Sequence, residues 1–261
     1  QVSLVFGIIF TYVSINSDSI LNVYHKIHLV PIAESVPLGS MFPSLKKMNI
    51  GQANFENGNE YTIFNINENK IAIIPNYIDT SLFRPIITKN KFNKILCVGR
   101  LNKQKNYSLL IESLNSSKIE IDIIGHGDRN NLIELSRKNN VKVNFIDNIE
   151  NKNLPLVYNS YSLFVLSSKY EGNPKSLLEA MSCGSRIIAT DVDGIRENHN
   201  GKNFLLVKED KYEIRSNIIE MINNQSLNKE MGEFARLYVL KNYDLQIIIK
   251  KFLKVYSKIK K

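Results

Sequence analysis

Beyond residue 94, the chain alternates short apolar runs with longer segments whose apolar residues recur at helical spacing. The short runs are rich in β-branched residues and predict buried strands. These strands are expected at Ile95–Val98, Ile119–Ile124, Val141–Phe145, Leu163–Leu166, Ile187–Thr190 and Phe204–Val207. Helices are expected at Tyr107–Leu114, Asn131–Lys138, Asn153–Ser160, Pro174–Met181, Lys211–Asn223, Asn228–Lys241 and Leu245–Ile259. The alternation indicates an α/β fold: a parallel sheet covered on both faces, with ligands beyond the carboxyl ends of the strands.

The pattern before residue 85 is less regular. Apolar runs predict strands at Ser3–Val13, His28–Ala33 and Lys70–Ile74, and Ser19–Ile27 is expected to be a short helix. Residues 35–60 carry Pro, Gly and Asn and are expected to form a loop. The first apolar run is too short to span a bilayer, which takes about 20 residues, and it lacks the basic flank of a signal peptide.

A boundary is predicted near residues 85–93. Pro85 and the polar run Thr88–Lys91 have the composition of a linker. We therefore expect a partial first domain at 1–86, a second domain at 87–240 and a C-terminal helix at 241–261. The first residue is Gln, from which we expect the chain to lack an N-terminal part.

Composition is that of a globular protein, with 43% hydrophobic and 23% charged residues among 261. The formal net charge of +9 suits nucleic acid, an anionic membrane surface or a phosphorylated ligand; a coding bias toward Lys, Asn and Ile explains it equally well. No motif of aromatic and basic residues supports a nucleic-acid partner. The two cysteines, Cys97 and Cys183, form no metal-binding pattern, and reduced thiols fit a cytoplasmic protein.

Candidate chemistry begins in the loop after the first strand of the second domain. This loop, Gly99–Asn106, carries Arg100 and Lys105. Arg can form two parallel hydrogen bonds to phosphate oxygens and Lys supplies a mobile charge, so the pair suits a diphosphate. The alternative is that this is a charged loop exposed to solvent. The following loop, Gly125–Asp128, lacks the third glycine of a dinucleotide fingerprint and is expected to be a tight turn.

The most informative segment is Ser167–Met181. Its Gly172 and Asn173 permit an unusual backbone ahead of a helix whose first turn would hold Pro174. Free N–H groups at such a helix start bind anions. Glu171 precedes the helix and Glu179 lies within it, too far apart for a carboxylate dyad. They are expected to bracket an extended ligand and accept hydroxyl hydrogen bonds, unless they are a surface glutamate and part of a capping loop.

The stretch from Lys94 to about Asn223 resembles glycosyltransferase family four, the glycosyl transferases group 1. These are retaining enzymes with the two-domain GT-B fold. The matching motifs are Val98–Leu101 with Lys105–Asn106, Ile124–Gly127, Glu171–Met181, and Ile188–Asp191 with Gly194 and Glu197; upstream, Ile74–Asp79 and Phe83–Pro85 resemble the segment that enters the nucleotide domain. The resemblance implies a complete Rossmann-like nucleotide-sugar domain preceded by a partial Rossmann-like acceptor domain.

The resemblance also implies residue roles. Arg100 and Lys105 would bind the donor diphosphate, Glu171 would contact the transferred sugar, and Glu179 would hold the ribose hydroxyls. The implied catalytic residues are Glu171, Arg100 and Lys105. The implied donor-binding residues are Gly99, Arg100, Lys105, Glu171, Gly172, Asn173, Pro174, Lys175, Ser176, Leu178 and Glu179.

The implied activity is transfer of a sugar, with retention, from a nucleotide-diphosphate sugar to a glycan or lipid-linked acceptor, in bacterial cell-surface polysaccharide or glycolipid synthesis. No cofactor is implied besides the nucleotide sugar as co-substrate. Two alternatives stay open. Because the acceptor domain is short, the chain could be a nucleotide-sugar-binding module without catalysis. A GT-B-fold sugar-nucleotide epimerase would instead need added carboxylates and histidines, which the first domain does not offer.

Two further patterns bear on metal and membrane. Asp191-Val192-Asp193 matches a DxD metal motif, but it follows a buried strand and precedes Gly194, so a turn leading into a short helix explains it without metal. The C-terminal helix shows either a face for an anionic membrane surface, which would place the protein on the inner face of the cell membrane, or a solvated face of a packed helix. Its basic and apolar residues are Lys250, Lys251, Lys254 and Lys258 with Ile248, Phe252, Leu253 and Tyr256.

Overall fold

The computed structural model describes residues 74–89, 91–224 and 229–259 and four two-residue strands before them. These strands form two antiparallel pairs, β1 (Ser14–Ile15) with β2 (Leu21–Asn22) and β3 (Ala53–Asn54) with β4 (Glu60–Tyr61). The helix predicted at Ser19–Ile27 is wrong at β2, because those two residues are paired through backbone hydrogen bonds. Strands β3 and β4 interrupt the predicted loop at 35–60. The strands predicted at 3–13, 28–33 and 70–74 lie outside the described residues, apart from Ile74, which is not in a strand.

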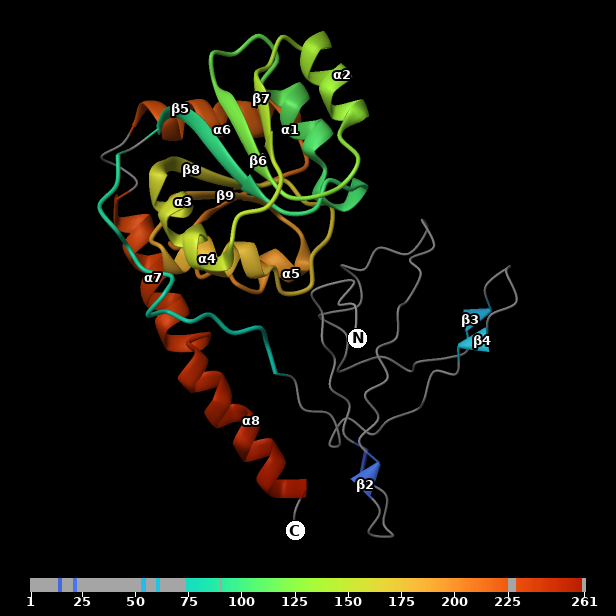
Figure 1. Cartoon of the computed structure of the whole chain (residues 1–261), viewed down its shortest axis with the longest axis vertical. Helices are drawn as coiled ribbons and strands as arrows, with labels where there is room; N and C mark the ends of the chain where they lie inside the picture. The colour runs from blue at the N-terminus through green and yellow to red at the C-terminus, as the bar shows by residue number, and fades with distance from the viewer. Residues whose placement is uncertain are drawn as a thin grey trace.

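The main sheet has six parallel strands in the order β10-β9-β8-β5-β6-β7. In chain order this is 3-2-1-4-5-6 read from β7, the arrangement of a doubly wound nucleotide-binding fold. Figure 1 shows the sheet between its two layers of helices. The strands are β5 (Lys91–Val98), β6 (Glu120–Ile124), β7 (Val143–Ile146), β8 (Tyr161–Leu166), β9 (Ile187–Thr190) and β10 (Leu205–Val207).

Helices connect these strands and close the domain. They are α1 (Tyr107–Ser113), α2 (Asn130–Lys138), α3 (Leu154–Ser160), α4 (Lys175–Ser182), α5 (Asp193–Arg196), α6 (Lys211–Asn223), α7 (Lys229–Asn242) and α8 (Leu245–Ile259). Two short 3-10 helices, η3 (Lys103–Lys105) and η4 (Asn151–Asn153), were not predicted. The strands and helices predicted after residue 94 are confirmed, and β9, α6 and α8 begin and end where predicted.

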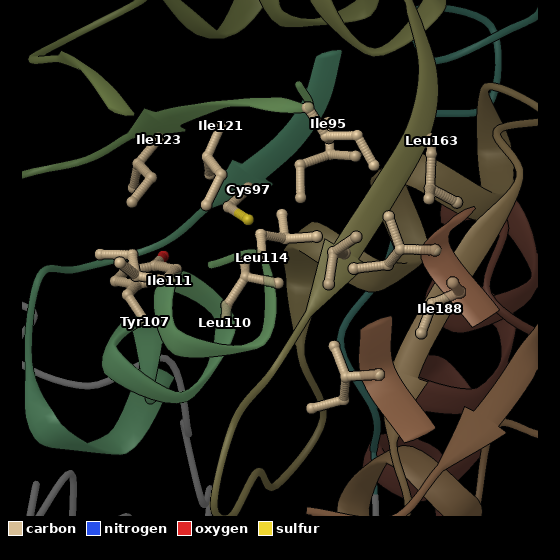
Figure 2. Close-up of a cluster of buried hydrophobic side chains, with 14 of the residues drawn as sticks. Ile95, Cys97, Tyr107, Leu110, Ile111, Leu114, Ile121, Ile123, Leu163 and Ile188 are labelled. Carbon is tan, nitrogen blue, oxygen red and sulfur yellow. The ribbon is translucent and has the colours of Figure 1, made fainter. Parts of the chain in front are cut away.

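The core lies on both faces of the sheet because successive side chains of a strand point to opposite faces. On one face Ile95 and Cys97 of β5 pack against α1 and α6 (Figure 2). On the other face Leu96 packs with residues of α3, α4 and α7. Cys97 and Cys183 are buried free thiols, and burial raises the pKa of Cys183 to about 12, so neither position is suited to reactive thiolate chemistry.

The segment before β5 packs along the α/β domain. Ile78 is buried and exchanges backbone hydrogen bonds with the turn between α7 and α8, at 2.9 Å from Tyr243 O and 2.9 Å from Leu245 N. Phe83 is also buried, and its carbonyl accepts a hydrogen bond from Ser182 Oγ at 2.6 Å. Strand β5 begins at Lys91, so the sheet starts inside the region of residues 85–93 in which the linker was predicted. The domain boundary at 86/87 stays a prediction.

Candidate functional site

The two strongest motifs of the sequence meet at the centre of the sheet. Strands β5 and β8 are neighbours at the point where the strand order reverses. The loops that follow them, 99–106 and 167–174, leave the same edge because the strands are parallel. Doubly wound folds bind their ligands in this crevice, beyond the carboxyl ends of the strands. The loops in which the sequence predicts ligand-binding residues therefore lie at the switch point of the sheet.

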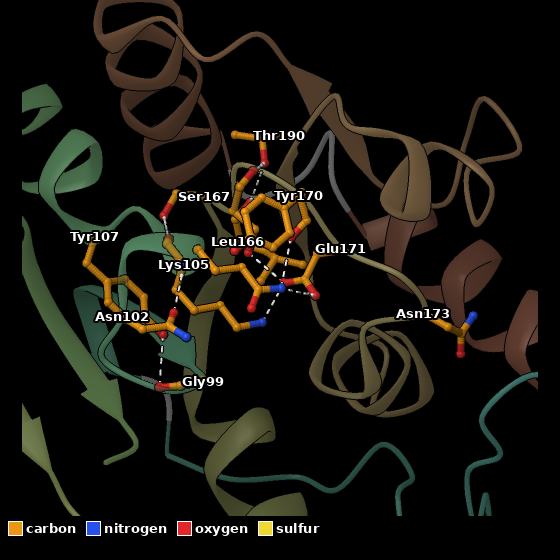
Figure 3. Close-up of polar contacts among 12 residues, drawn as sticks. Gly99, Asn102, Lys105, Tyr107, Leu166, Ser167, Tyr170, Glu171, Asn173 and Thr190 are labelled. Carbon is orange, nitrogen blue, oxygen red and sulfur yellow. Dashed lines mark hydrogen bonds and ion pairs between the residues drawn. The ribbon is translucent and has the colours of Figure 1, made fainter. Parts of the chain in front are cut away.

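Hydrogen bonds join the two loops to each other. Lys169 N donates to Gln104 O at 2.8 Å, and Ser167 Oγ donates to Lys105 O at 2.9 Å. The side chain of Gln104 also donates from Nε2 to Tyr170 O at 3.0 Å. Figure 3 shows these contacts around the end of the sheet. Because backbone groups are bound on both sides, the position from which Lys105 extends its side chain is fixed.

Lys105 and Glu171 form a nearly buried ion pair, with 2.5 Å between Nζ and Oε1. Their side chains are only 12% and 7% exposed. Ser168 Oγ donates to the same carboxylate oxygen at 2.6 Å, and Gln104 Nε2 lies 3.5 Å from the other oxygen. A carboxylate can be buried only when donors surround it. The site thus presents one ammonium and one carboxylate of fixed position at the sheet edge.

Two glycines make this packing possible. A Cβ at Gly99 would lie 2.8 Å from Lys105 Cε, so the lysine stem crosses the space that a side chain would fill. A Cβ at Gly194 would overlap the carbonyl oxygens of Glu171 and Gly172. Helix α5 therefore lies directly against the backbone that carries Glu171. Gly194 belongs to the family motif, but its contact with Glu171 was not foreseen from the sequence.

Glu179 has a different environment from Glu171. It lies in α4, is 5% exposed, and accepts a 2.9 Å hydrogen bond at Oε2 from the hydroxyl of Tyr158 in α3. Burial raises the pKa of Glu179 to about 6, while the Tyr158 hydrogen bond and the charge of Lys175 act in the opposite direction. The two acids thus have separate hydrogen-bond partners, and the expectation that they form no dyad stays a prediction.

The start of α4 differs in detail from the prediction. The helix begins at Lys175, and Pro174 is the residue before it, with extended backbone, instead of the first helical residue. The N–H groups of Lys175 and Ser176 have no carbonyl one turn earlier within the helix. Lys175 is exposed and Ser176 half-buried. Leu178 is fully buried in the core, which makes its side chain a packing residue.

Two other predicted site residues are Arg100, which precedes Lys105 in the chain, and Asn173, which follows Glu171. Arg100 is exposed in the loop after β5. Asn173 is directed away from Lys105 and Glu171 in Figure 3. Its Oδ1 accepts from Asn76 N at 3.2 Å, and its carbonyl accepts from Asn76 Nδ2 at 2.6 Å. Asn173 therefore ties the loop after β8 to the segment that precedes β5, a contact between distant residues that the sequence pattern could not reveal.

The Asp-Val-Asp segment forms the predicted turn. Asp193 begins α5, and Arg196 binds both aspartates, at 2.6 Å to Asp191 and 2.7 Å to Asp193. Within the described ranges, no group of three or more His, Cys, Asp or Glu side chains could hold a metal ion. The two carboxylates thus have a partner in the chain, and metal independence stays a prediction.

Sequence reasoning missed three residues that support the acids. Ser168 and Gln104 lie inside the two recognised motifs, so their place beside Glu171 could have been suspected from chain position alone. Tyr158 lies on a helix whose periodicity predicts only a buried side chain. Its contact with Glu179 depends on how α3 and α4 pack, which no local pattern records.

Comparisons with known proteins identify the family of this chain. The family model "Glycosyl transferases group 1" matches residues 79–238. An uncharacterised glycosyltransferase of Methanocaldococcus jannaschii is 30% identical over 190 residues, which are 66% of this chain and 47% of that protein. An N-acetylgalactosaminyltransferase of Campylobacter jejuni, which acts on a diphospho-undecaprenol-linked sugar, is 30% identical over 156 residues, 56% of this chain and 42% of that protein. The chain spans about half the length of the curated relatives it matches.

Solved structures share the fold. The structure of Anabaena HepE in complex with UDP superposes with a TM-score of 0.67 at 17% identity, over 74% of this chain and 58% of that one. Such a likeness supports the fold, an α/β domain matching GT-B glycosyltransferases, as the sequence resemblance implied. The family model covers most of the α/β domain and all of the motifs at the switch point. The chain belongs to the glycosyl transferases group 1 family.

Proposed function

We propose that this chain provides the donor site of a retaining glycosyltransferase, which moves a sugar from a nucleoside-diphosphate sugar to a hydroxyl acceptor. The observation that carries the proposal is the Lys105–Glu171 ion pair, held at the switch point of the sheet by loops from two family motifs. The UDP in the HepE structure and the sugar transfer in the name of the Campylobacter relative support the same class of ligand and reaction.

The positive end of the site suits the leaving diphosphate. Lys105 and Arg100 follow β5, and α4 begins after the loop that follows β8, so these groups lie at one edge of the sheet. A helix N-terminus and nearby cations stabilise developing negative charge without reorganisation. Lys105 has three N–H donors, so it can keep its contact with Glu171 and also contact a phosphate oxygen. In this proposal the cations replace a metal ion.

The acids suit the two sugars of the donor. Glu171, in the loop, would accept hydrogen bonds from the transferred sugar, and Glu179, in α4, would accept them from the ribose hydroxyls. In the reaction, the bond from the anomeric carbon to the diphosphate oxygen breaks and a bond to the acceptor oxygen forms on the same face. The acceptor proton passes to the leaving phosphate oxygen, so no protein base is required.

The acceptor side is proposed from the relatives and from α8. A glycan or lipid-linked acceptor in cell-surface polysaccharide or glycolipid synthesis fits the Campylobacter relative's name. Helix α8 exposes Lys250, Lys251 and Lys254 beside Phe252 and Leu253, a combination that suits the anionic inner face of a cell membrane. No described helix is long and apolar enough to cross a membrane. Sedimentation with anionic vesicles at low salt, against neutral vesicles, tests this contact.

Calorimetry with uridine, guanosine and adenosine diphosphates tests the donor site. Arg100→Ala and Lys105→Ala each remove a charged hydrogen-bond donor, worth about 1.5–3 kcal/mol. We therefore expect each change to weaken the best-bound diphosphate roughly 10-fold or more. Lys94→Ala is the matched control, because Lys94 also forms an ion pair with a glutamate, 2.6 Å from Glu120, but within the strands. Equal affinity in wild type, Arg100→Ala and Lys105→Ala would falsify the assignment.

A binding module without catalysis is the second candidate. The two candidates share the donor site and differ in turnover. Release of labelled sugar from the donor, with acceptor or with water, separates them. Tight diphosphate binding without any turnover by the whole chain supports the module.

A further inference from the structure

A buried tyrosine supports the acid to which we assign the ribose. Tyr158 of α3 donates its hydroxyl hydrogen to Glu179 Oε2 at 2.9 Å. We propose that Tyr158 is a positioning residue, which holds one oxygen of Glu179 so that the other faces the ribose hydroxyls of the nucleotide. This inference rests on the proposed function of Glu179 and concerns a residue that touches no ligand itself.

The ring of Tyr158 is fixed by two other aromatic rings. It is 1% exposed, and its centroid lies 6.2 Å from that of Phe83 at 61° and 5.7 Å from that of Phe164 at 59°. Phe83 comes from the segment before β5 and Phe164 from β8. Offset and edge-on ring contacts restrain orientation beyond simple burial. The hydroxyl of Tyr158 is therefore held at one place, and a buried hydroxyl of this kind needs an acceptor there.

Within the described part of the chain, the carboxylate of Glu179 is anchored at Oε2, which accepts the hydrogen bond from Tyr158. Each carboxylate oxygen can accept about two hydrogen bonds. Oε1, the other oxygen, thus has the capacity to receive both hydroxyls of a ribose diol.

The hydroxyl also favours the ionised form of Glu179. Burial raises the pKa of Glu179, and the hydrogen bond from Tyr158 counteracts it, as does Lys175 one turn away. The other titratable groups nearby are Cys183, the residue after α4, whose thiol stays protonated, and Arg236 on α7, which packs against α4. Removal of the hydroxyl is therefore expected to raise the pKa of Glu179 further.

The test compares each of the three nucleoside diphosphates with its 2′,3′-dideoxy form, in calorimetry on the whole chain. Tyr158→Phe keeps the ring and removes the hydroxyl. We expect it to weaken the ribonucleotide about 5- to 30-fold, while the dideoxy form changes less than about twofold. Tyr161→Phe is the matched control, because Tyr161 also donates to a buried carboxylate, Asp122, at 2.6 Å, but from within the strands. It should leave the preference for ribose unchanged.

The pH profile of binding gives a readout that loss of packing would not move. Wild-type affinity for the ribonucleotide should fall below about pH 6 as Glu179 takes up a proton. In Tyr158→Phe the fall should begin at higher pH. Site-specific 3-fluorotyrosine at position 158 keeps the hydroxyl and makes it a stronger donor, so it should move the fall to lower pH. This second variant serves if Tyr158→Phe does not fold.

The outcomes are distinguishable. If wild type prefers the ribonucleotide but Tyr158→Phe keeps that preference and the same pH profile, Tyr158 is a packing residue and the inference is wrong. An unmoved profile in the fluorotyrosine protein leads to the same conclusion. If wild type binds both forms equally, Glu179 does not hold the ribose and that part of the proposed function fails. If it binds no diphosphate, the donor site itself is wrong.

Discussion

Two lysine–glutamate ion pairs of nearly equal length lie at opposite ends of the central strands. At the carboxyl end, Lys105 Nζ lies 2.5 Å from Glu171, with both side chains almost buried in loops. Toward the amino end, Lys94 Nζ lies 2.6 Å from Glu120, with side chains 29% and 24% exposed on β5 and β6. The first pair joins loops that are far apart in the sequence. The second joins adjacent, paired strands.

The two pairs share their residue types and differ in their position in the fold, and we propose that only the first belongs to a ligand site. A partly exposed pair on neighbouring strands contributes about 0–1 kcal/mol and stabilises the alignment of those strands. A buried pair must offset the desolvation of both charges, so it is weak evidence for stability alone. At the crevice where doubly wound folds bind ligands, the same two residue types form the pair that we propose as part of the donor site. The predictions below separate these two roles.

The largest effect is expected from Gly194→Ala. The added Cβ would overlap the carbonyls of Glu171 and Gly172, so the loop must shift although neither member of the ion pair is changed. Overpacking of this kind costs typically about 1–3 kcal/mol. We expect a lower melting temperature and at least a roughly 10-fold loss of diphosphate affinity, because a site of this kind depends on sub-ångström placement.

Gly201→Ala is the control for Gly194→Ala. Gly201 has a φ of +86°, and a Cβ there would meet nothing within 4 Å. Its substitution carries the strain of a left-handed residue, about 1–2 kcal/mol, without moving the Glu171 loop. Affinity should therefore be retained in Gly201→Ala at a similar loss of stability. If the two alanine variants bind diphosphate equally well, the contact between α5 and the Glu171 backbone does not shape the site.

A smaller effect is expected from Ser168→Ala. The change removes the 2.6 Å hydrogen bond to Glu171 Oε1, while Lys105 stays in place. Hydrogen bonds to charged groups are worth about 1.5–3 kcal/mol. We expect Ser168→Ala to weaken binding of the intact nucleotide sugar more than binding of the diphosphate alone, since Glu171 is assigned to the transferred sugar. Calorimetry with both ligands measures the difference.

Ser113→Ala provides the comparison for Ser168→Ala. Ser113 is buried and donates to Leu110 O at 2.7 Å within α1. Its loss should lower the melting temperature and leave both affinities unchanged. An equal loss of affinity for sugar nucleotide and diphosphate in Ser168→Ala would contradict the assignment of Glu171 to the sugar.

The sequence predicts the α/β domain well because its signals there are local. Buried parallel strands are continuous apolar runs, and β9 is predicted to the residue from Ile187–Thr190 alone. For the candidate site, the sequence motifs predict which loops carry Lys105 and Glu171. What was missed joins residues that are distant in the chain, such as Asn76 with Asn173 and Tyr158 with Glu179. Such contacts depend on the packing of helices and loops, and no spacing of residues encodes them.

The smallest effect is expected from Glu120→Gln at the amino end. Hydrogen bonds from Lys94 and Lys142 lower the pKa of Glu120, so its folded pKa lies below the unfolded one. Such a group contributes stability above its unfolded pKa, and the contribution is lost as pH falls through the folded pKa. At pH 7 the variant should be less stable by roughly 0.2–1 kcal/mol, and in more acid solution its melting temperature should approach that of wild type. Diphosphate affinity should be unchanged throughout, because Glu120 lies on the strands and not in the loops. A loss of affinity as large as that of Ser168→Ala would mean that the two ends of the sheet are coupled, and the contrast between the two ion pairs would then have to be abandoned.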